Sequence, residues 1–445
     1  MADDRDLRLL LDRTAVVDVV GGIANALDAK DWARLRSLVN DPWRRSRREG
    51  ARGVAGTRSL PRETDRAHRD GAQPRRGSGR VPRGPAPPLA PARRLRLRGR
   101  RPMKPLTYRA AGVDIDAGED AVRRIAPLAR ATARPEVLGG IGGFAAFVSL
   151  PPRYREPVLV SSTDGVGTKL KVAFLADRHD TVGIDLVAMG VNDLLVHGAE
   201  PLYFLDYIGI ARLDPARVET IVKGMAEGCR RAGCALVGGE TAELPDLYAA
   251  GEYDLAGFAV GVVERARIVD GAAVRPGDVV LGLASSGLHA NGYSLARRIV
   301  FGVMGLTVRD ALPGVGRPVA DELLEPTRIY AKAVQALLAR VDVHGMAHIT
   351  GGGLTGNLPR VLPEGCRARI SRAAWRVPPV FETLQRAGQV ADAEMFRAFN
   401  MGVGYVAVVP PAVADAAAST LREAGETVVS LGEIVRGERG VELTP

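Results

Sequence analysis

The sequence predicts an α/β protein with two folded domains. Two observations support this fold class. From residue 104 onward, short aliphatic runs typical of strands alternate with segments whose apolar residues recur at a helical period. Around residues 264–278 the chain becomes polar and contains Gly and Pro, after which the alternation starts again. We therefore expect one domain over residues 103–270 and a second α/β domain over residues 271–445.

The net charge is concentrated in one part of the chain. The 445 residues include 61 Lys+Arg and 51 Asp+Glu, which gives a formal charge of +10. Residues 43–102 alone contain 19 Arg, no Lys and 4 acidic groups. The remainder is mildly acidic and aliphatic, and it is long enough for two or three domains with cores. The composition excludes a wholly disordered protein and confines the basic character to one segment.

The first hundred residues differ from the rest. Residues 1–42 are expected to form a short helical remnant. Residues 43–102 are expected to be disordered, because a segment so rich in Arg, Pro and Gly cannot bury enough surface to offset its chain entropy. This segment is either an arm that neutralises nucleic-acid phosphates or a tail without a selected role, encoded ahead of a true start at Met103. We favour the tail, since interleaved aromatic residues are missing, and expect no nucleic-acid partner.

Helix and strand signals alternate through the first domain. Asp116 and Glu119 resemble a capping pair, so a helix is expected there, and Pro127 should interrupt it. Asp214 followed by proline is typical of a helix N-terminus, and Gly233 should end that helix. A further helix is expected from the apolar face at residues 184, 187, 191 and 194. The expected strands are residues 157–160, 202–208, 235–237 and 255–263.

The strands of both domains are followed by loops of small residues. In the second domain the expected strands are residues 279–284, 344–349 and 402–409. Glycine lets backbone N–H groups converge on an anion, and a following helix adds its positive end. Five such loops occur, at residues 139–143, 164–169, 238–243, 285–292 and 350–357. The sequence therefore predicts a site for several phosphates, or for one nucleotide and one phosphorylated substrate, at the strand ends.

Several common sites are excluded by motif spacing. No loop has the Walker A spacing or the G-x-G-x-x-G spacing of dinucleotide sites, and neither G-x-S-x-G nor H-E-x-x-H occurs. The three cysteines, Cys229, Cys234 and Cys366, cannot form a disulfide framework and lack C-x-x-C spacing. The longest apolar run, residues 255–263, is too short for a bilayer, and the acidic opening is unlike a signal peptide. We expect a cytoplasmic protein with no membrane partner.

Carboxylates at strand ends are the candidates for binding a metal. If ATP is bound, Mg²⁺ must bridge its phosphates, and hard cations prefer carboxylate oxygens. Asp164 and Asp193 are the first candidates, and Asp185 and Glu240 are the second choices. Asp185 could equally be a helix carboxylate that caps or pairs. Lys169 could contact a phosphate, or be a solvated lysine in the first turn of a helix.

Histidine and asparagine side chains supply the remaining candidates. His289 lies in a loop of Ser, Gly and Asn, and it is the best candidate for an acid, a base or a phosphate donor. His344 and His348 could simply be hydrogen-bonded strand residues. Asn291 and Asn400 offer amides to a substrate, or only stabilise their own turns.

Longer stretches from Tyr108 to the C-terminus match one known family. They include Ala111-Gly-Val-Asp-Ile-Asp-Ala-Gly118, Thr163-Asp-Gly-Val-Gly-Thr-Lys-Leu170, Val191-Asn-Asp-Leu194, Gly238-Gly-Glu-Thr-Ala-Glu243 and Phe399-Asn-Met-Gly-Val-Gly404. On these residues the chain resembles the phosphoribosylformylglycinamidine cyclo-ligases, also called aminoimidazole ribonucleotide synthetases. Ala290 stands where that family usually has serine. The first hundred residues have no counterpart in the family.

The resemblance implies an ATP-dependent ring closure in purine biosynthesis. The formyl oxygen of formylglycinamidine ribonucleotide would take the γ-phosphoryl group, and the amidine nitrogen would then attack that carbon. Loss of phosphate gives 5-aminoimidazole ribonucleotide, with ADP. The resemblance also implies a homodimer in which the N-terminal domains contribute strands to a shared β-barrel. Other ATP-using enzymes of the superfamily are the alternatives, namely a thiamine-phosphate kinase or a selenophosphate synthetase; the early glycine loop lacks the Cys of the latter.

The loop pattern and the resemblance together predict the site residues. Catalysis is assigned to Asp164, Lys169 and His289, and Mg²⁺ to Asp164 and Asp193. The expected ATP contacts are Gly139, Gly140, Gly142, Gly143, Asp164, Gly165, Gly167, Thr168, Asp193 and Glu240. The expected substrate contacts are Ser285, Ser286, His289, Asn291, Thr350, Gly351, Gly352 and Asn400.

Overall fold

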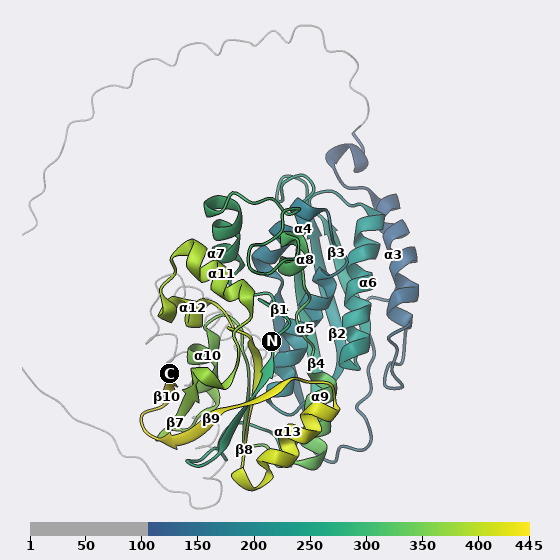
Figure 1. Ribbon diagram of the computed structural model, residues 1–445. Helices are drawn as coiled ribbons and strands as arrows, with labels where there is room; N and C mark the ends of the chain where they lie inside the picture. Colours follow the sequence, from purple (N-terminus) through teal and green to yellow (C-terminus); the bar gives the residue numbers. More distant parts are fainter. Residues whose placement is uncertain (1–105) are drawn as a thin grey trace, which may run out of the picture. The chain divides into compact units, whose positions relative to one another are not determined.

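The structure is a computed structural model that describes residues 106–445 (Figure 1). The helical remnant expected at residues 1–42, the Arg-rich segment at residues 43–102 and the start at Met103 lie outside the described residues. The described residues fall within one compact unit of the chain and build two sheets, one in each domain.

The first domain contains a four-stranded sheet in the order β1-β4-β2-β3. Its strands are β1 (Pro157–Gly165), β2 (Glu200–Ile210), β3 (Ala235–Glu243) and β4 (Tyr253–Glu264). β4 runs antiparallel to both β1 and β2, and β3 runs parallel to β2. Gly257 of β4 is paired with Asp164 on one side and with Asp206 on the other. Because directly paired residues share a face, the two carboxylates point to the same face of the sheet.

Helices cover that face of the sheet. The helices are α3 (Ile115–Arg130), α4 (Leu170–Ala176), α5 (Val182–Val196) and α6 (Pro215–Ala232). Helix α5 contacts β1, β2 and β4, α6 packs on α5, and α3 packs on α6 (Figure 1). Helix α5 is buried almost throughout, since it also contacts α9 (Ala331–Arg340) and β6 (Gly345–His348) of the second domain. It therefore carries its polar residues directly to the junction of the two domains.

The helix boundaries test the predicted caps. Helix α6 begins after Asp214, whose carboxylate accepts a hydrogen bond from the Ala216 N–H, and it ends before Gly233 with a positive φ, both as predicted. The capping pair predicted for α3 is wrong, because Asp114 is the N-cap and accepts from the Ala117 N–H. Helix α3 also continues past Pro127 to Arg130. A proline near a helix end removes a single hydrogen bond, so three further residues stay helical.

The second domain is built on a six-stranded mixed sheet in the order β10-β7-β9-β5-β8-β6. Besides β6, its strands are β5 (Val279–Ala284), β7 (Cys366–Ser371), β8 (Val403–Val409), β9 (Val428–Arg436) and β10 (Gly440–Thr444). Its helices, besides α9, are α7 (Tyr293–Arg297), α8 (Val319–Leu323), α10 (Gly353–Asn357), α11 (Pro379–Gly388), α12 (Asp392–Ala398) and α13 (Ala414–Glu423). The strand predicted over residues 279–284 is confirmed without a shift.

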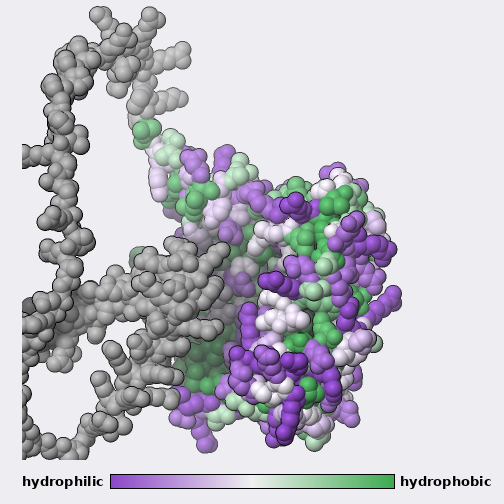
Figure 2. Space-filling model, turned by 90° about the vertical axis from the view of Figure 1, so that its left-hand side faces the viewer, coloured by the Kyte–Doolittle hydropathy of each residue, from purple (hydrophilic) through white to green (hydrophobic). Residues whose placement is uncertain are grey.

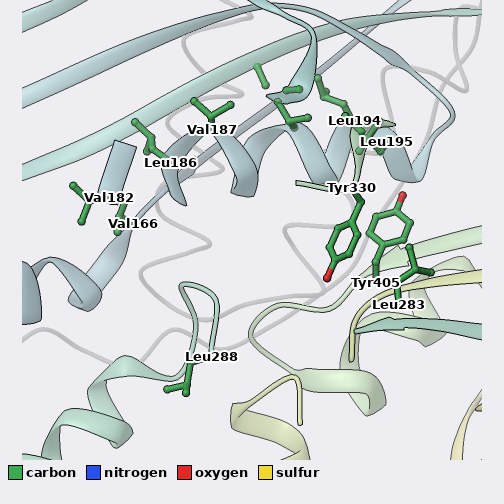
Figure 3. Packing of buried hydrophobic residues seen from close by; sticks show 14 of the residues in the cluster. Val166, Val182, Leu186, Val187, Leu194, Leu195, Leu283, Leu288, Tyr330 and Tyr405 are labelled. Atoms are coloured by element: carbon green, nitrogen blue, oxygen red, sulfur yellow. The ribbon is translucent and has the colours of Figure 1, made fainter. Parts of the chain in front are cut away.

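One buried apolar cluster runs through both domains. It joins the α5 side chains Leu186 and Leu194 to Leu283 of β5 and Tyr405 of β8 (Figure 3). The Tyr330 and Tyr405 rings lie with their centroids 5.2 Å apart and are fully buried. A second cluster fills the opposite side of the second-domain sheet. Continuous burial of this kind opposes independent motion of the two domains.

Strand β3 differs from the sequence expectation. Residues 238–243 were expected to form a loop after a three-residue strand, but β3 continues through them to Glu243. Pairing with Asp206 to Ile210 of β2 holds these residues extended. The glycines Gly238 and Gly239 therefore belong to an edge strand, and their role is to leave space beside it rather than to form a turn.

The described surface mixes apolar and polar residues. On the face drawn in Figure 2, hydrophobic residues are interspersed with hydrophilic ones. Over residues 106–445, no helix has the length and apolar character required for a membrane span.

Close packing of α5 on α6 depends on Gly183. A Cβ at Gly183 would overlap the Ile221 carbonyl oxygen and the Met225 nitrogen of α6. We expect Gly183→Ala to lower the free energy of unfolding by about 1–3 kcal/mol, because the two helices must separate. Gly118→Ala in α3 is the control, since a Cβ there meets nothing within 4 Å. Urea unfolding measures both, and equal stability of the two variants would contradict the packing.

Candidate functional site

Two carboxylates and a histidine meet where the domains join. Asp164 lies at the end of β1 and Asp193 lies on α5. His348 of β6 donates from Nδ1 to Asp193 Oδ1 at 2.9 Å, and Ser162 Oγ donates to Asp193 Oδ2 at 3.4 Å. Asp164 Oδ1 accepts from the Gly165 N–H at 2.8 Å. The second domain therefore orients a carboxylate of the first.

The charges of this cluster suit a bound cation. Burial raises the pKa of Asp164, and the negative charge of Asp193 raises it further. The hydrogen bond from the Gly165 N–H and the charge of His348 lower this pKa without cancelling the increase. A divalent cation between the two carboxylates would offset their repulsion. Among residues 106–445, no group of three or more His, Cys, Asp or Glu side chains could hold a metal alone. Mg²⁺ needs no such cage, because one or two carboxylates together with substrate phosphates and water usually complete its shell.

Lys169 is a buried structural cation. Its side chain is 0% exposed, so the interpretation as a solvated lysine is wrong. Its Nζ donates to Asp185 Oδ1 at 2.9 Å, to the His289 carbonyl at 2.9 Å and to the Glu325 carbonyl at 2.6 Å. Three acceptors occupy all three N–H donors of a lysine. The expected phosphate contact is therefore not supported, and Lys169 positions the loops around it.

Asp185 is the partner of Lys169. Its Oδ1 also accepts from the Thr327 N–H at 2.7 Å and from Thr327 Oγ1 at 2.6 Å. Burial raises the pKa of Asp185 and lowers that of Lys169, and the attraction within the ion pair opposes both shifts. The interpretation of Asp185 as a helix carboxylate that pairs is confirmed, and the pair joins α5 to two loops of the second domain.

His289 is buried in a strained loop. It has a φ of 62°, and its side chain is 1% exposed. The Ser286 N–H donates to Nε2 at 3.2 Å, so the neutral ring carries its proton on Nδ1, which has no partner among residues 106–445. Burial lowers the pKa of His289 well below its usual value. A role as a general acid at neutral pH is therefore not supported, and Nδ1–H is a neutral donor.

The candidates Asn400, Ser285 and Ser286 of the second domain form hydrogen bonds that stabilise the loops around them. Asn400 accepts from Ser285 Oγ at 3.1 Å and from the Gly402 N–H at 2.8 Å, and it donates to the Gly287 carbonyl. Ser286 Oγ donates to the Pro326 carbonyl at 2.6 Å. These side chains are occupied by protein partners, so any contact with substrate would come from the backbone beside them.

The loops at residues 164–169 and 350–357 also border the junction of the domains. The Thr350 N–H donates to the Asn357 side chain at 3.0 Å, and Gly352 has a φ of 104°. A Cβ at Gly351 would lie 3.4 Å from the Asn291 side chain, so the loops at residues 285–292 and 350–357 are adjacent. Thr168 of the first domain lies 3.1 Å from Ser294, measured between the hydroxyl oxygens. Three of the five predicted loops therefore meet here.

The other two glycine segments meet elsewhere on the first domain. The loop at Gly140–Gly143 faces β2 and β3 across a cavity of 480 Å³ that is lined by Asp206 and Glu240, among other residues. Asp206 was not among the predicted site residues, since its motif was interpreted only as part of a strand. Burial, with the nearby Glu240, raises the pKa of Asp206 to about 7. One signal was available in the sequence. Asp206 is two residues from Phe204 and two from Ile208, so in a strand its side chain points to the same face as these two apolar residues, which are buried.

The base of this glycine loop is fixed by an ionic network. Arg134 donates to Glu136, to Glu200 and to two backbone carbonyls. Arg153 and Tyr154 also donate to Glu200. The backbone bridge from Val137 to Val148 closes the loop above this network. The exposed tip is therefore carried on a fixed base.

Comparison with known proteins identifies the family. Residues 144–263 match the N-terminal domain, and residues 275–443 the C-terminal domain, of AIR synthase related proteins. The phosphoribosylformylglycinamidine cyclo-ligase of Geotalea daltonii is 57% identical over 338 residues, which cover 76% of this chain and 97% of that protein. The chain belongs to the phosphoribosylformylglycinamidine cyclo-ligase family. The cyclo-ligase of Sorangium cellulosum is 60% identical over 332 residues, covering 74% of this chain and 95% of that protein.

Solved structures show the same fold at low identity. HypE of E. coli superposes with a TM-score of 0.54 and 21% identity over 74% of this chain and 94% of that chain. The thiamine-monophosphate kinase of Stenotrophomonas maltophilia superposes with a TM-score of 0.53 and 19% identity. The match covers 73% of this chain and 95% of that chain. These likenesses confirm the two-domain α/β fold and carry no statement about substrate.

The buried ion pair gives a stability prediction. We expect Lys169→Met to lower the free energy of unfolding by about 3–5 kcal/mol, because the Asp185 charge is left buried without its partner. Lys171→Met is the control: its ion pair with Glu252 is partly exposed, so its loss should cost about 0–1 kcal/mol. Adding Asp185→Asn to Lys169→Met should recover part of the loss. Chemical denaturation measures the free energy of unfolding of the two single variants and the double variant. A smaller loss of stability in Lys169→Met than in Lys171→Met would contradict the structural role of Lys169.

Proposed function

We propose that this chain catalyses the ATP-dependent closure of formylglycinamidine ribonucleotide to 5-aminoimidazole ribonucleotide, with release of ADP and phosphate. The structural observation that carries the proposal is the junction of Asp164 and Asp193 with the second-domain loops, joined by the His348 hydrogen bond. Membership of the cyclo-ligase family, with 97% coverage of a named relative, supplies the substrate. The thiamine-monophosphate kinase shares only the fold at 19% identity, so it supports no competing substrate.

The residues at the junction fit phosphoryl transfer. The formyl oxygen of the substrate attacks the γ-phosphorus of ATP, and ADP leaves. The amidine nitrogen then attacks the activated carbon, a proton is lost from that nitrogen, and the C–O bond breaks to release phosphate. This chemistry needs positioning and charge neutralisation, and it needs no covalent nucleophile on the protein.

Each part of the site has a proposed role in that sequence. Asp164 and Asp193 would hold Mg²⁺, which neutralises phosphate charge when bound. Gly167 and Thr168 would present backbone N–H groups to the phosphates, whereas the Gly165 N–H is already bonded to Asp164 Oδ1. The loops around His289 and Gly351 would bind the ribose phosphate, with Lys169 holding the first of these loops in place.

The open face of the first-domain sheet supports a homodimer. Leu159 of β1 is 55% exposed and Phe258 of β4 is 43% exposed, on the face opposite the helices. A second copy that adds its own sheet would cover these side chains and close the shared β-barrel. We expect Phe258→Asp to halve the mass measured by light scattering, because a charge cannot be buried there. A wild-type chain that is monomeric at micromolar concentration would refute the dimer.

Removal of either carboxylate proposed to hold the metal should lower turnover strongly. With formylglycinamidine ribonucleotide, ATP and Mg²⁺, we expect Asp164→Asn and Asp193→Asn each to lower kcat by about a hundredfold or more, since lost transition-state stabilisation of about 3 kcal/mol has that effect. Asp415→Asn, at an exposed position of α13, is the matched control. A coupled assay of ADP release gives the rates. Near-normal turnover by both site variants would refute the metal site, and turnover on thiamine phosphate alone would refute the proposed substrate.

A further inference from the structure

Arg297 of α7 is the one partly buried arginine of residues 106–445 without a protein partner. Its Nε is fully buried and has no hydrogen-bond partner. The other partly buried arginines in this range each donate a hydrogen bond or form an ion pair, and they are Arg134, Arg178, Arg217, Arg328 and Arg367. A charged donor left unpaired in a partly buried position is unfavourable, so this side chain favours an anionic ligand.

Arg297 lies on the face of α7 that is turned toward the first domain. Ser294 Oγ lies 3.1 Å from Thr168 Oγ1 of the first domain. Lys169 Nζ lies 5.5 Å from the centre of the Tyr293 ring. Arg297 follows Ser294 by three positions and Tyr293 by four, so it lies on the same face of the helix. Because long side chains of a helix lean toward its N-terminus, the guanidinium is expected beside the loop that contains Thr168.

The proposed reaction brings several phosphate charges to this junction. Phosphoryl transfer requires that these charges be neutralised, commonly by arginine or lysine side chains in addition to Mg²⁺. Lys169 is not free to do so, because three protein acceptors occupy its three N–H donors. Arg328 is already paired with Glu426. Arg297 remains available, and its planar guanidinium can donate two parallel hydrogen bonds to one phosphate.

We propose that Arg297 binds a phosphate group where the two domains meet. This inference rests on the proposed function and adds a residue of the second domain to the binding of phosphate. Two phosphates share the required chemistry. Helix α7 follows the loop at residues 285–292, where the ribose phosphate is proposed to bind, and packs against the loop at residues 164–169, where the phosphates of ATP are proposed to bind.

Titration calorimetry of the full chain measures this role without turnover. One titration uses ADP with Mg²⁺, and the other uses formylglycinamidine ribonucleotide alone. We expect Arg297→Met to weaken the binding of at least one of these ligands by about tenfold to a hundredfold, because charged hydrogen bonds are lost while the apolar stem is kept. The affinity of Arg297→Lys should lie between those of the wild type and Arg297→Met, since lysine keeps the charge but not the paired donors.

Arg436→Met is the matched control for these titrations. Arg436 is exposed and ends β9, whereas the residue of β9 that pairs with Leu283, near the loop at residues 285–292, is Val428 at the other end of the strand. Removal of this distant arginine should leave both affinities unchanged. Adenosine and formylglycinamidine ribonucleoside lack phosphate, so each should bind Arg297→Met and the wild type equally.

Stability separates a binding role from a structural one. A structural arginine would resemble Lys169, whose loss is expected to destabilise the fold. Arg297→Met removes a donor that has no protein partner, so we expect the urea midpoint to be unchanged or higher. A large loss of stability, or a failure of Arg297→Met to fold, would therefore overturn the proposal.

The two sources of phosphate give different results. Weaker binding of ADP alone assigns Arg297 to the nucleotide, weaker binding of the ribonucleotide alone assigns it to the substrate, and weaker binding of both places it between them. Unchanged affinity of Arg297→Met for both phosphorylated ligands would overturn the proposal. An effect of Arg297→Met on binding, in a chain that does not turn over formylglycinamidine ribonucleotide, would support the phosphate site and refute the proposed reaction.

Discussion

One buried ammonium group ties the two domains together. Lys169 Nζ has one acceptor in its own domain, Asp185, and two carbonyl acceptors in the second domain. Burial of a lone charge is strongly unfavourable, so the folded state keeps this lysine only while all three acceptors stay in place. Lys169 follows Asp164 by five residues, and one of its acceptors is the backbone of His289. The relative position of the metal-binding candidate and the substrate loop therefore depends on this single group.

Helix α5 extends the same constraint along the junction. Besides Asp185, it presents Asn192, whose amide donates to the Arg328 carbonyl and accepts from the Tyr330 N–H, and Asp193, which is bonded to His348. All three side chains bind atoms of the second domain while the rest of the helix is packed in the core. A rigid, buried helix is well suited to phosphoryl transfer, because that reaction needs fixed geometry more than flexible groups.

Local signals were sufficient for some features and not for others. The caps of α6 depend on neighbours in sequence, so Asp214 and Gly233 could be predicted. Asp164 could be proposed because an Asp between a strand and glycines has little packing purpose, and Asp193 could be proposed as the carboxylate of the Asn192-Asp193 pair. The structural role of Lys169 could not be predicted, since it arises from burial and from carbonyl partners more than a hundred residues away. The loop predicted at the glycines of β3 is wrong for the same reason, because pairing with β2 holds these residues extended.

The most direct test is a crystal structure of the full chain with Mg²⁺, a non-hydrolysable ATP analogue and formylglycinamidine ribonucleotide. We expect one metal ion with oxygens of both Asp164 and Asp193 at about 2.0–2.1 Å, and the γ-phosphorus facing the formyl oxygen. A metal ion bound away from these carboxylates, or a substrate bound outside the junction of the two domains, would contradict it.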